Sequence, residues 1–127
     1  MEFRETLPIY LQIADFVCEK ILSKEWKADF RVPSVRELAI SLEVNPNTVM
    51  RTYEFLQQKD ILFNQRGVGL FVSSDAHKNA LAYLKEKFMQ KEMPVFFRGM
   101  TLLGLDIEDL ESLFKKYLEN SISSNKT

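Results

Sequence analysis

Apolar residues recur with a helical period near the start of the chain. Those on one face of a helix with 3.6 residues per turn are Tyr10, Ile13, Ala14, Val17, Cys18 and Ile21. Pro8 suits a first helical position, because proline has no N–H to donate there. The pattern predicts a helix from Pro8 to Ser23. A polar loop anchored by Trp26 and Phe30 is expected to follow it.

Two short amphipathic segments come next, and each opens on a start signal. Ser34 and Glu37 have the spacing of a capping box, in which each side chain accepts a hydrogen bond from the other's backbone amide. This signal predicts a helix over Ser34–Leu42. Asn45 then offers an N-cap to a second helix that begins at Pro46. The apolar positions of the two segments are Val35, Leu38, Ala39 and Leu42, then Val49, Tyr53 and Leu56. Two short helices joined by a tight turn indicate a helix-turn-helix.

Two strand-like runs follow the second helix. Ile61–Gln65 and Leu70–Ser73 flank the sequence Arg66-Gly67-Val68-Gly69. Closely spaced glycines between β-formers predict a hairpin. A helix-turn-helix followed by a hairpin is the winged-helix arrangement.

The rest of the chain is helical in pattern. We expect one helix from Ala76 to about Lys91, a second from Pro94 to Leu103 that ends at Gly104, and a last one capped by Asp106. The predicted organisation is a winged helix-turn-helix DNA-binding domain over 1–74, a helical dimerisation segment over 75–120 and a flexible tail over 121–127. The fold class is therefore mainly α with a small β-hairpin wing and a short all-helical tail.

Composition and charge narrow the functions available. The 127 residues are 46% hydrophobic and 28% charged, which is typical of a globular protein. Neither a membrane span nor a signal peptide is evident, so we expect a cytoplasmic protein without a membrane partner. A single cysteine, Cys18, and a single histidine, His77, argue against a disulfide framework and a metal site. No cofactor is expected.

The formal net charge of −1 does not favour general nucleic-acid binding, but a local basic face remains possible. Charges beyond about 8–10 Å are screened at physiological salt, so the location of the charges matters more than their sum. Arg31, Arg36, Arg51, Lys59 and Arg66 lie in the helix-turn-helix and hairpin segment, whereas a run of acids lies within 106–111.

A helix-turn-helix places the start of its second helix in the major groove of DNA. Asparagine can pair with adenine, arginine with guanine or phosphate, and threonine with either a base or phosphate. Gly67 would allow close approach of the backbone to DNA. The predicted DNA-binding residues are Ser34, Arg36, Asn45, Pro46, Asn47, Thr48, Arg51, Arg66 and Gly67. Each also has a structural interpretation, as a cap, a surface arginine or a turn former.

Three motifs lie within residues 7–73: PIYLQIADFVCEKI, VPSVRELAISLEVNPNTVMRTYEFL and RGVGLFVS. Together they resemble the winged-helix domain of the GntR family of bacterial transcription regulators. The resemblance implies operator contacts from the positions of Arg36, Asn45, Asn47, Thr48, Arg51 and Gly67. The segment FFRGMTLLGLDIEDLESLF is similar to the helical dimerisation segment of the short-tailed YtrA subfamily.

The chain departs from the family pattern at several positions. Family glycines or prolines are replaced by Lys24, Ala28, Asp29, Glu43 and Asp60, from which we expect stiffer loops on the same fold. In the wing, Val68 replaces a common basic residue and Leu70 a common threonine. Met50 stands where many relatives carry arginine. From these changes we expect each copy to bind DNA weakly, and we expect dimerisation to raise the affinity.

The helical tail is too short to bury a large core by itself, so we expect it to pack against a second copy. The leading hypothesis is a homodimeric, sequence-specific transcription regulator that binds a palindromic operator in double-stranded DNA. Of the two kinds of regulator, a repressor is expected rather than an activator. The alternative is a winged-helix protein-interaction module without specific DNA binding. A small-molecule effector at the dimer interface is left open. An enzyme is not supported, because no nucleophile–base pair or phosphate loop is evident.

Overall fold

The computed structural model describes residues 1, 3 and 7–125. Internal contacts divide the chain into two compact units, Met1–Glu86 and Lys87–Thr127. This division falls after the boundary expected at 74/75, because Ala76 and Ala80 are buried in the core of the first unit. No helix within the described part of the chain is both long and apolar enough to cross a membrane.

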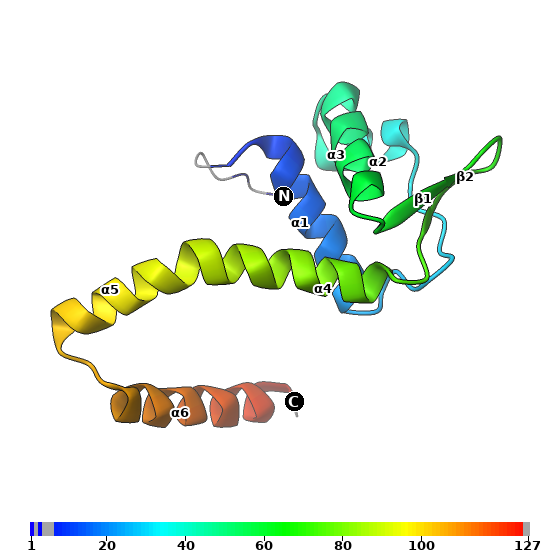
Figure 1. Ribbon diagram of the computed structural model, residues 1–127. Coiled ribbons are helices and arrows are strands. Elements are labelled where there is room, and N and C mark those ends of the chain that lie inside the picture. Colours follow the sequence, from blue (N-terminus) through cyan, green and yellow to red (C-terminus); the bar gives the residue numbers. More distant parts are fainter. Residues whose placement is uncertain (2, 4–6, 126–127) are drawn as a thin grey trace. The chain divides into compact units, whose positions relative to one another are not determined.

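Three helices form the body of the first unit (Figure 1). They are α1 (Ile9–Leu22), α2 (Val35–Leu42) and α3 (Pro46–Gln58). The sequence predicted all three, although Pro8 is the N-cap of α1 rather than its first helical residue. The shared core includes Ile13 and Val17 of α1 and Leu56 of α3, each fully buried. Cys18 is buried in the same core, as its helical spacing predicted.

The predicted hairpin follows α3. Strands β1 (Leu62–Gln65) and β2 (Gly69–Val72) are antiparallel, with Leu62 opposite Val72 and Gln65 opposite Gly69. The segment before α2 lies along the other edge of β2, where the Val32 amide donates to the Leu70 carbonyl at 2.9 Å. The wing is therefore fixed at its base to the loop that leads into α2.

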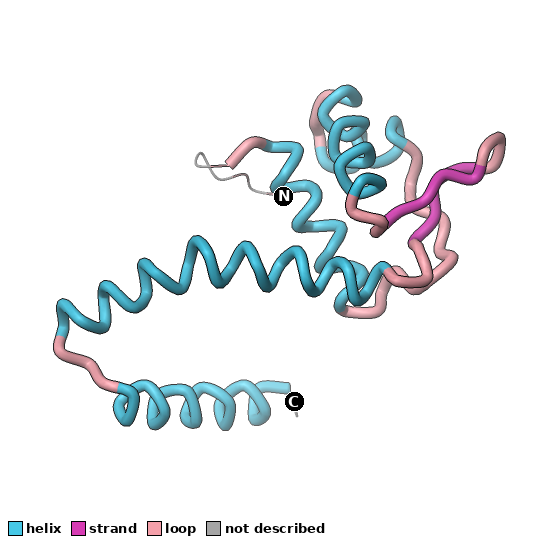
Figure 2. The backbone as a smooth tube through the Cα atoms, in the orientation of Figure 1, coloured by secondary structure: helices cyan, strands magenta, loops and turns pink. Residues whose placement is uncertain are grey.

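The helical run from α4 (Ala76–Lys87) to α5 (Met93–Leu103) is continuous (Figure 2). The short break expected between Lys91 and Pro94 is absent, although a second helix does begin at Met93, next to Pro94, and ends at Leu103. A π-helical turn, η1 (Phe88–Glu92), joins the two helices, and the Met93 amide donates to the Phe88 carbonyl five residues back. Pro94 then stands in the first turn of α5.

The last helix, α6 (Ile107–Asn125), is longer than expected. Gly104 ends α5 in the left-handed conformation at φ 72°, as predicted. Asp106 caps α6, since its Oδ1 accepts from the Asp109 amide at 2.9 Å. The flexible tail was expected over 121–127; residues 121–125 are part of α6, and 126 and 127 lie outside the described residues.

Candidate nucleic-acid interface

The start of α2 is held by the predicted capping box. The Ser34 Oγ accepts from the Glu37 amide at 3.1 Å, and the Glu37 Oε1 accepts from the Ser34 amide at 3.1 Å. The pKa of Glu37 is lowered below its ordinary 4.5. The main cause is the hydrogen bond from the Ser34 backbone amide, and the Ser34 side chain makes a smaller contribution. Glu37 therefore stays charged at its own helix terminus, and Arg36 beside it is exposed.

The start of α3 is capped in the same local way. The Asn45 Oδ1 accepts from the Asn47 amide at 2.8 Å, and Pro46 occupies the first turn. The Asn45 oxygen is thus engaged, whereas the Asn47 side chain is exposed. Thr48 is half-buried and Arg51 is exposed. The first turns of α3 consequently present polar groups that are not required by the core.

Two buried side chains fix α3 on its neighbours. The Thr52 hydroxyl donates to the Tyr10 carbonyl at 2.7 Å, which ties α3 to α1. The Tyr53 hydroxyl donates to the Pro33 carbonyl at 2.7 Å, one residue before the α2 cap. Burial raises the pKa of Tyr53, so its proton stays in place. These bonds orient the exposed face of α3 relative to α1 and α2.

Arg51 is positioned by an aromatic ring from α1. Its guanidinium carbon lies 3.9 Å from the centroid of the Tyr10 ring, a cation–π contact. The ring is in turn held edge-on by Phe55, with centroids 6.3 Å apart. A concave surface of about 340 Å³ surrounds the contact, lined by Pro8, Ile9, Tyr10, Asn47, Thr48 and Arg51. From the sequence, Tyr10 is evident only as a member of the apolar face of its helix.

The tip of the wing is a tight turn. The Val68 amide donates to the Gln65 carbonyl at 2.9 Å, and Gly67 has φ 78° at the third turn position. A β-turn with positive φ at that position favours glycine. Arg66 and Val68 beside it are exposed. The tip therefore presents one cation and one apolar side chain.

A further cation, Arg31, lies against the wing. A Cβ at Gly69 would come within 2.9 Å of the Arg31 Nε, so glycine leaves the room through which this side chain passes. In the sequence, Arg31 is evident only as a charge. Its contact joins residues 38 positions apart, and no local pattern marks it.

The structure places the nine predicted residues in three segments of the first unit. Asn47, Thr48 and Arg51 line one concave surface, whereas Ser34 and Arg36 begin α2, and Arg66 and Gly67 form the wing tip. Asn45 and Pro46 begin α3. Within the described residues, Arg36, Arg51 and Arg66 form no ion pair, and no group of three His, Cys, Asp or Glu residues could hold a metal ion. The unpaired cations suit an anionic partner.

Comparison with known proteins identifies that partner class. Residues 9–72 match the family described as bacterial regulatory proteins, gntR family. The chain is 36% identical to the HTH-type transcriptional regulator YhcF of Bacillus subtilis, over 93% of this chain and 96% of that protein. It is 32% identical to the HTH-type transcriptional repressor YtrA of Bacillus subtilis, over 89% of this chain and 86% of that protein.

Among solved structures, a putative GntR-family transcriptional regulator from Bacteroides thetaiotaomicron is 40% identical, with a TM-score of 0.77 over 90% of this chain and 99% of that one. These matches are to regulators rather than to enzymes, and they confirm the winged helix with a helical tail. The chain belongs to the GntR family of DNA-binding transcriptional regulators, and it is similar to the short-tailed YtrA type.

Proposed function

We propose that this chain is a homodimeric repressor that binds a palindromic operator through the first turns of α3. The supporting observation is the exposed polar start of α3, held on α1 and on the α2 segment by the Thr52 and Tyr53 hydroxyls. A rigid mounting of this kind lets a helix enter the major groove without losing its orientation. Cytoplasmic location follows from the proposal, because operator DNA lies there in a bacterium.

In this proposal, the nine predicted residues divide into base readers and backbone contacts. Asn47 reads a base edge, because its side chain is exposed and uninvolved in the cap. Arg36 and Arg66 contact phosphates from the start of α2 and from the wing tip. Arg51, stacked on Tyr10, is presented at the edge of α3 for a phosphate or a base. The remaining members of the set are Ser34, Asn45, Pro46, Thr48 and Gly67.

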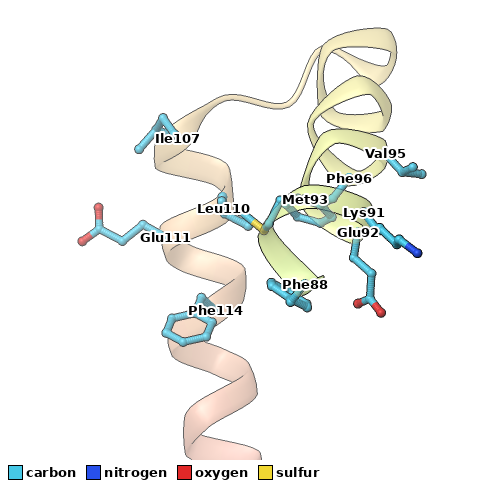
Figure 3. A pocket seen from close by; sticks show the side chains of 10 residues that line it. All are labelled: Phe88, Lys91, Glu92, Met93, Val95, Phe96, Ile107, Leu110, Glu111 and Phe114. Atoms are coloured by element: carbon cyan, nitrogen blue, oxygen red, sulfur yellow. The ribbon is translucent and has the colours of Figure 1, made fainter. Parts of the chain in front are cut away.

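The second unit supplies the proposed dimer interface. Its large apolar side chains that are 41% to 83% exposed are Phe88, Met89, Val95, Phe96, Phe97, Leu102, Leu103, Leu105, Ile107, Leu113, Phe114, Tyr117, Leu118 and Ile122. An apolar surface of this extent marks an interaction site on a folded protein. A cavity of about 930 Å³ lies between α5 and α6, and Figure 3 shows Met93, Leu110 and Phe114 among its lining side chains. We propose that the helices of a second copy cover it.

Titration of the full-length protein with promoter DNA tests operator binding. We expect Arg36→Ala and Arg51→Ala each to weaken specific binding by about 1–3 kcal/mol where they meet bases, and to reduce the salt dependence where they meet phosphates. Lys27→Ala removes an exposed charge from the loop after α1 and serves as the control. If affinity stays at a Kd of about 10⁻⁴–10⁻⁶ M for every native promoter, the proposal fails and the protein-interaction module is favoured.

Analytical ultracentrifugation tests the dimer. Phe96→Glu places a carboxylate on the cavity lining, and burial of an unpaired charge is strongly unfavourable. We expect this variant to sediment as a monomer and to bind operator more weakly. Lys116→Glu introduces the same carboxylate at an exposed polar position of α6 and should remain dimeric. A wild-type monomer at micromolar concentration would contradict the proposal. The expectation concerning an effector stays a prediction.

A further inference from the structure

One apolar side chain stands exposed within the polar face of α3. Met50 is 45% exposed, whereas its neighbour Val49 is fully buried in the core. Asn47 precedes Met50 by three residues and Glu54 follows it by four, and both are exposed. Residues at these spacings are neighbours on a helix surface. Met50 therefore belongs to the same exposed stripe as Asn47, and the core does not account for it.

The chemistry of methionine limits what Met50 could recognise on DNA. Its thioether has no hydrogen-bond donor and is a weak acceptor, so it cannot read the polar pattern of a base edge. The major groove offers one apolar group, the 5-methyl of thymine. Three rotatable bonds let methionine adapt to such a group. An apolar contact at this position would distinguish thymine from the other bases.

The neighbouring side chains place Met50 beside the proposed base reader. The Arg51 guanidinium is held over the Tyr10 ring of α1. Asn47 and Met50 are separated by three residues, a rise of about 4.5 Å along a helix axis. Successive bases on one strand are about 3.4 Å apart. The two side chains can therefore meet the same base step or adjacent ones.

We propose that Met50 packs against the 5-methyl group of a thymine in each operator half-site and makes that position specific for thymine. This inference rests on the proposed placement of α3 in the major groove. In this inference, the exposed face of α3 that carries Asn47 and Met50 recognises DNA in two ways. Asn47 recognises a polar base edge, and Met50 recognises an apolar group one turn further along the helix.

Deoxyuridine substitution isolates the methyl group, because uracil pairs as thymine does and lacks only the 5-methyl. The probe is a duplex selected from a random library by the full-length wild-type protein. Each thymine is replaced in turn by deoxyuridine, and affinity is measured by fluorescence anisotropy. At one thymine in each half-site, we expect the wild type to lose about fourfold in affinity, the effect of one buried methylene-sized group.

Variants of the protein then assign that loss to Met50. Met50→Ala should bind the thymine duplex more weakly and should show no further loss with deoxyuridine. Met50→Leu keeps an apolar side chain and should retain the sensitivity. Asn47→Ala is the matched control on the same stripe; it should weaken binding yet keep the full deoxyuridine effect. Circular dichroism confirms that each variant is folded.

The outcomes separate this inference from the proposed function. If the wild type binds a selected duplex tightly but no thymine is sensitive to loss of its methyl, the inference is overturned while the proposed function stands. Equal sensitivity in Met50→Ala and wild type overturns it as well. If no duplex is enriched over non-specific binding, the proposed function fails and the inference fails with it.

Discussion

Glu43 holds a backbone conformation that costs free energy, and replacing it with glycine should stabilise the protein. Glu43 ends α2 with φ 56° and ψ 49°, in the left-handed region. The Val44 amide donates to the Ala39 carbonyl at 3.0 Å, the bond that closes a Schellman motif. Glycine preserves this backbone bond. The Glu43 side chain is exposed and makes no ion pair within the described residues, so Glu43→Gly removes no side-chain contact of that kind.

The magnitude follows from three contributions, of which the second opposes the other two. The left-handed conformation costs a residue with a Cβ about 1–2 kcal/mol. Glycine gives up about 0.5–1 kcal/mol because it has more conformational freedom in the unfolded chain. Loss of an acidic group at a helix C-terminus adds about 0.3 kcal/mol or more. We expect a net stabilisation of about 0.5–1 kcal/mol, or roughly 2–6 °C in Tm.

Urea unfolding at matched protein concentration measures this difference, since dimerisation would make stability concentration-dependent. Glu43→Gln removes the charge but keeps the Cβ, so it should recover only the helix-terminus contribution. Glu19→Gly makes the same replacement inside α1 and should destabilise by about 1 kcal/mol. If Glu43→Gln stabilises as much as Glu43→Gly, the backbone argument is wrong and charge explains the gain.

Two further predictions concern the interface. Tyr10→Leu should weaken operator binding by about 0.5–2 kcal/mol when Arg51 is present, because it removes the ring of the cation–π contact, and Tyr10→Phe should not. Additive losses in a double-mutant cycle with Arg51→Ala would contradict this coupling. Ser34→Ala should cost about 1 kcal/mol and raise the pKa of Glu37 towards 4.5, with exposed Ser41→Ala as the control. Folding lowers the pKa of Glu37, so the charged carboxylate stabilises the folded state above pH 4.5, and this stabilisation is lost as the pH falls through the folded pKa. If an NMR titration gives Glu37 the same pKa in Ser34→Ala as in the wild type, the role of the Ser34 side chain is refuted.

The capped helices could be predicted from the sequence because their signals are local. Ser34 and Glu37 are three residues apart, and Asn45 lies next to Pro46, so each signal acts within one helical turn. The wing was found for the same reason, since Gly67 marks its turn. The same locality explains why the nine predicted contact residues fall in three exposed segments of one unit.

Other features depend on residues far apart in the sequence or on small choices of hydrogen bonding. The stacking of Arg51 on Tyr10 joins α3 to α1, and the passage of Arg31 beside Gly69 joins a loop to β2. No periodicity reports either contact. The sequence did not predict the continuous helix through Pro94. In the π-helical turn before it, the Met93 amide donates to a carbonyl five residues back instead of four, and no sequence pattern marks this change. Propensity alone treats such a proline as a break.

The replaced family glycines show how a departure from a pattern can keep the fold and change its energy. Stiffer loops were expected at five positions, and four of them adopt positive φ: Lys24 at 66°, Asp29 at 68°, Glu43 at 56° and Asp60 at 57°. The backbone at these four positions has the conformation that glycine would adopt. The replacements therefore strain the backbone and do not change the path of the chain. Aspartate tolerates this conformation better than lysine or glutamate.

A slightly acidic chain can bind DNA where individual exposed cations face the duplex. Glu37 is held at the N-terminus of α2, where the helix amides favour its negative charge. Arg36 and Arg66 remain exposed and without ion pairs among the described residues of the first unit. The acidic run over 106–111 belongs to the second unit, and the exposed acids nearest α3 are Glu43, Glu54 and Asp60. Since screening confines each field to about 8–10 Å, the balance near α3 and the wing decides DNA affinity, and the net charge of −1 does not.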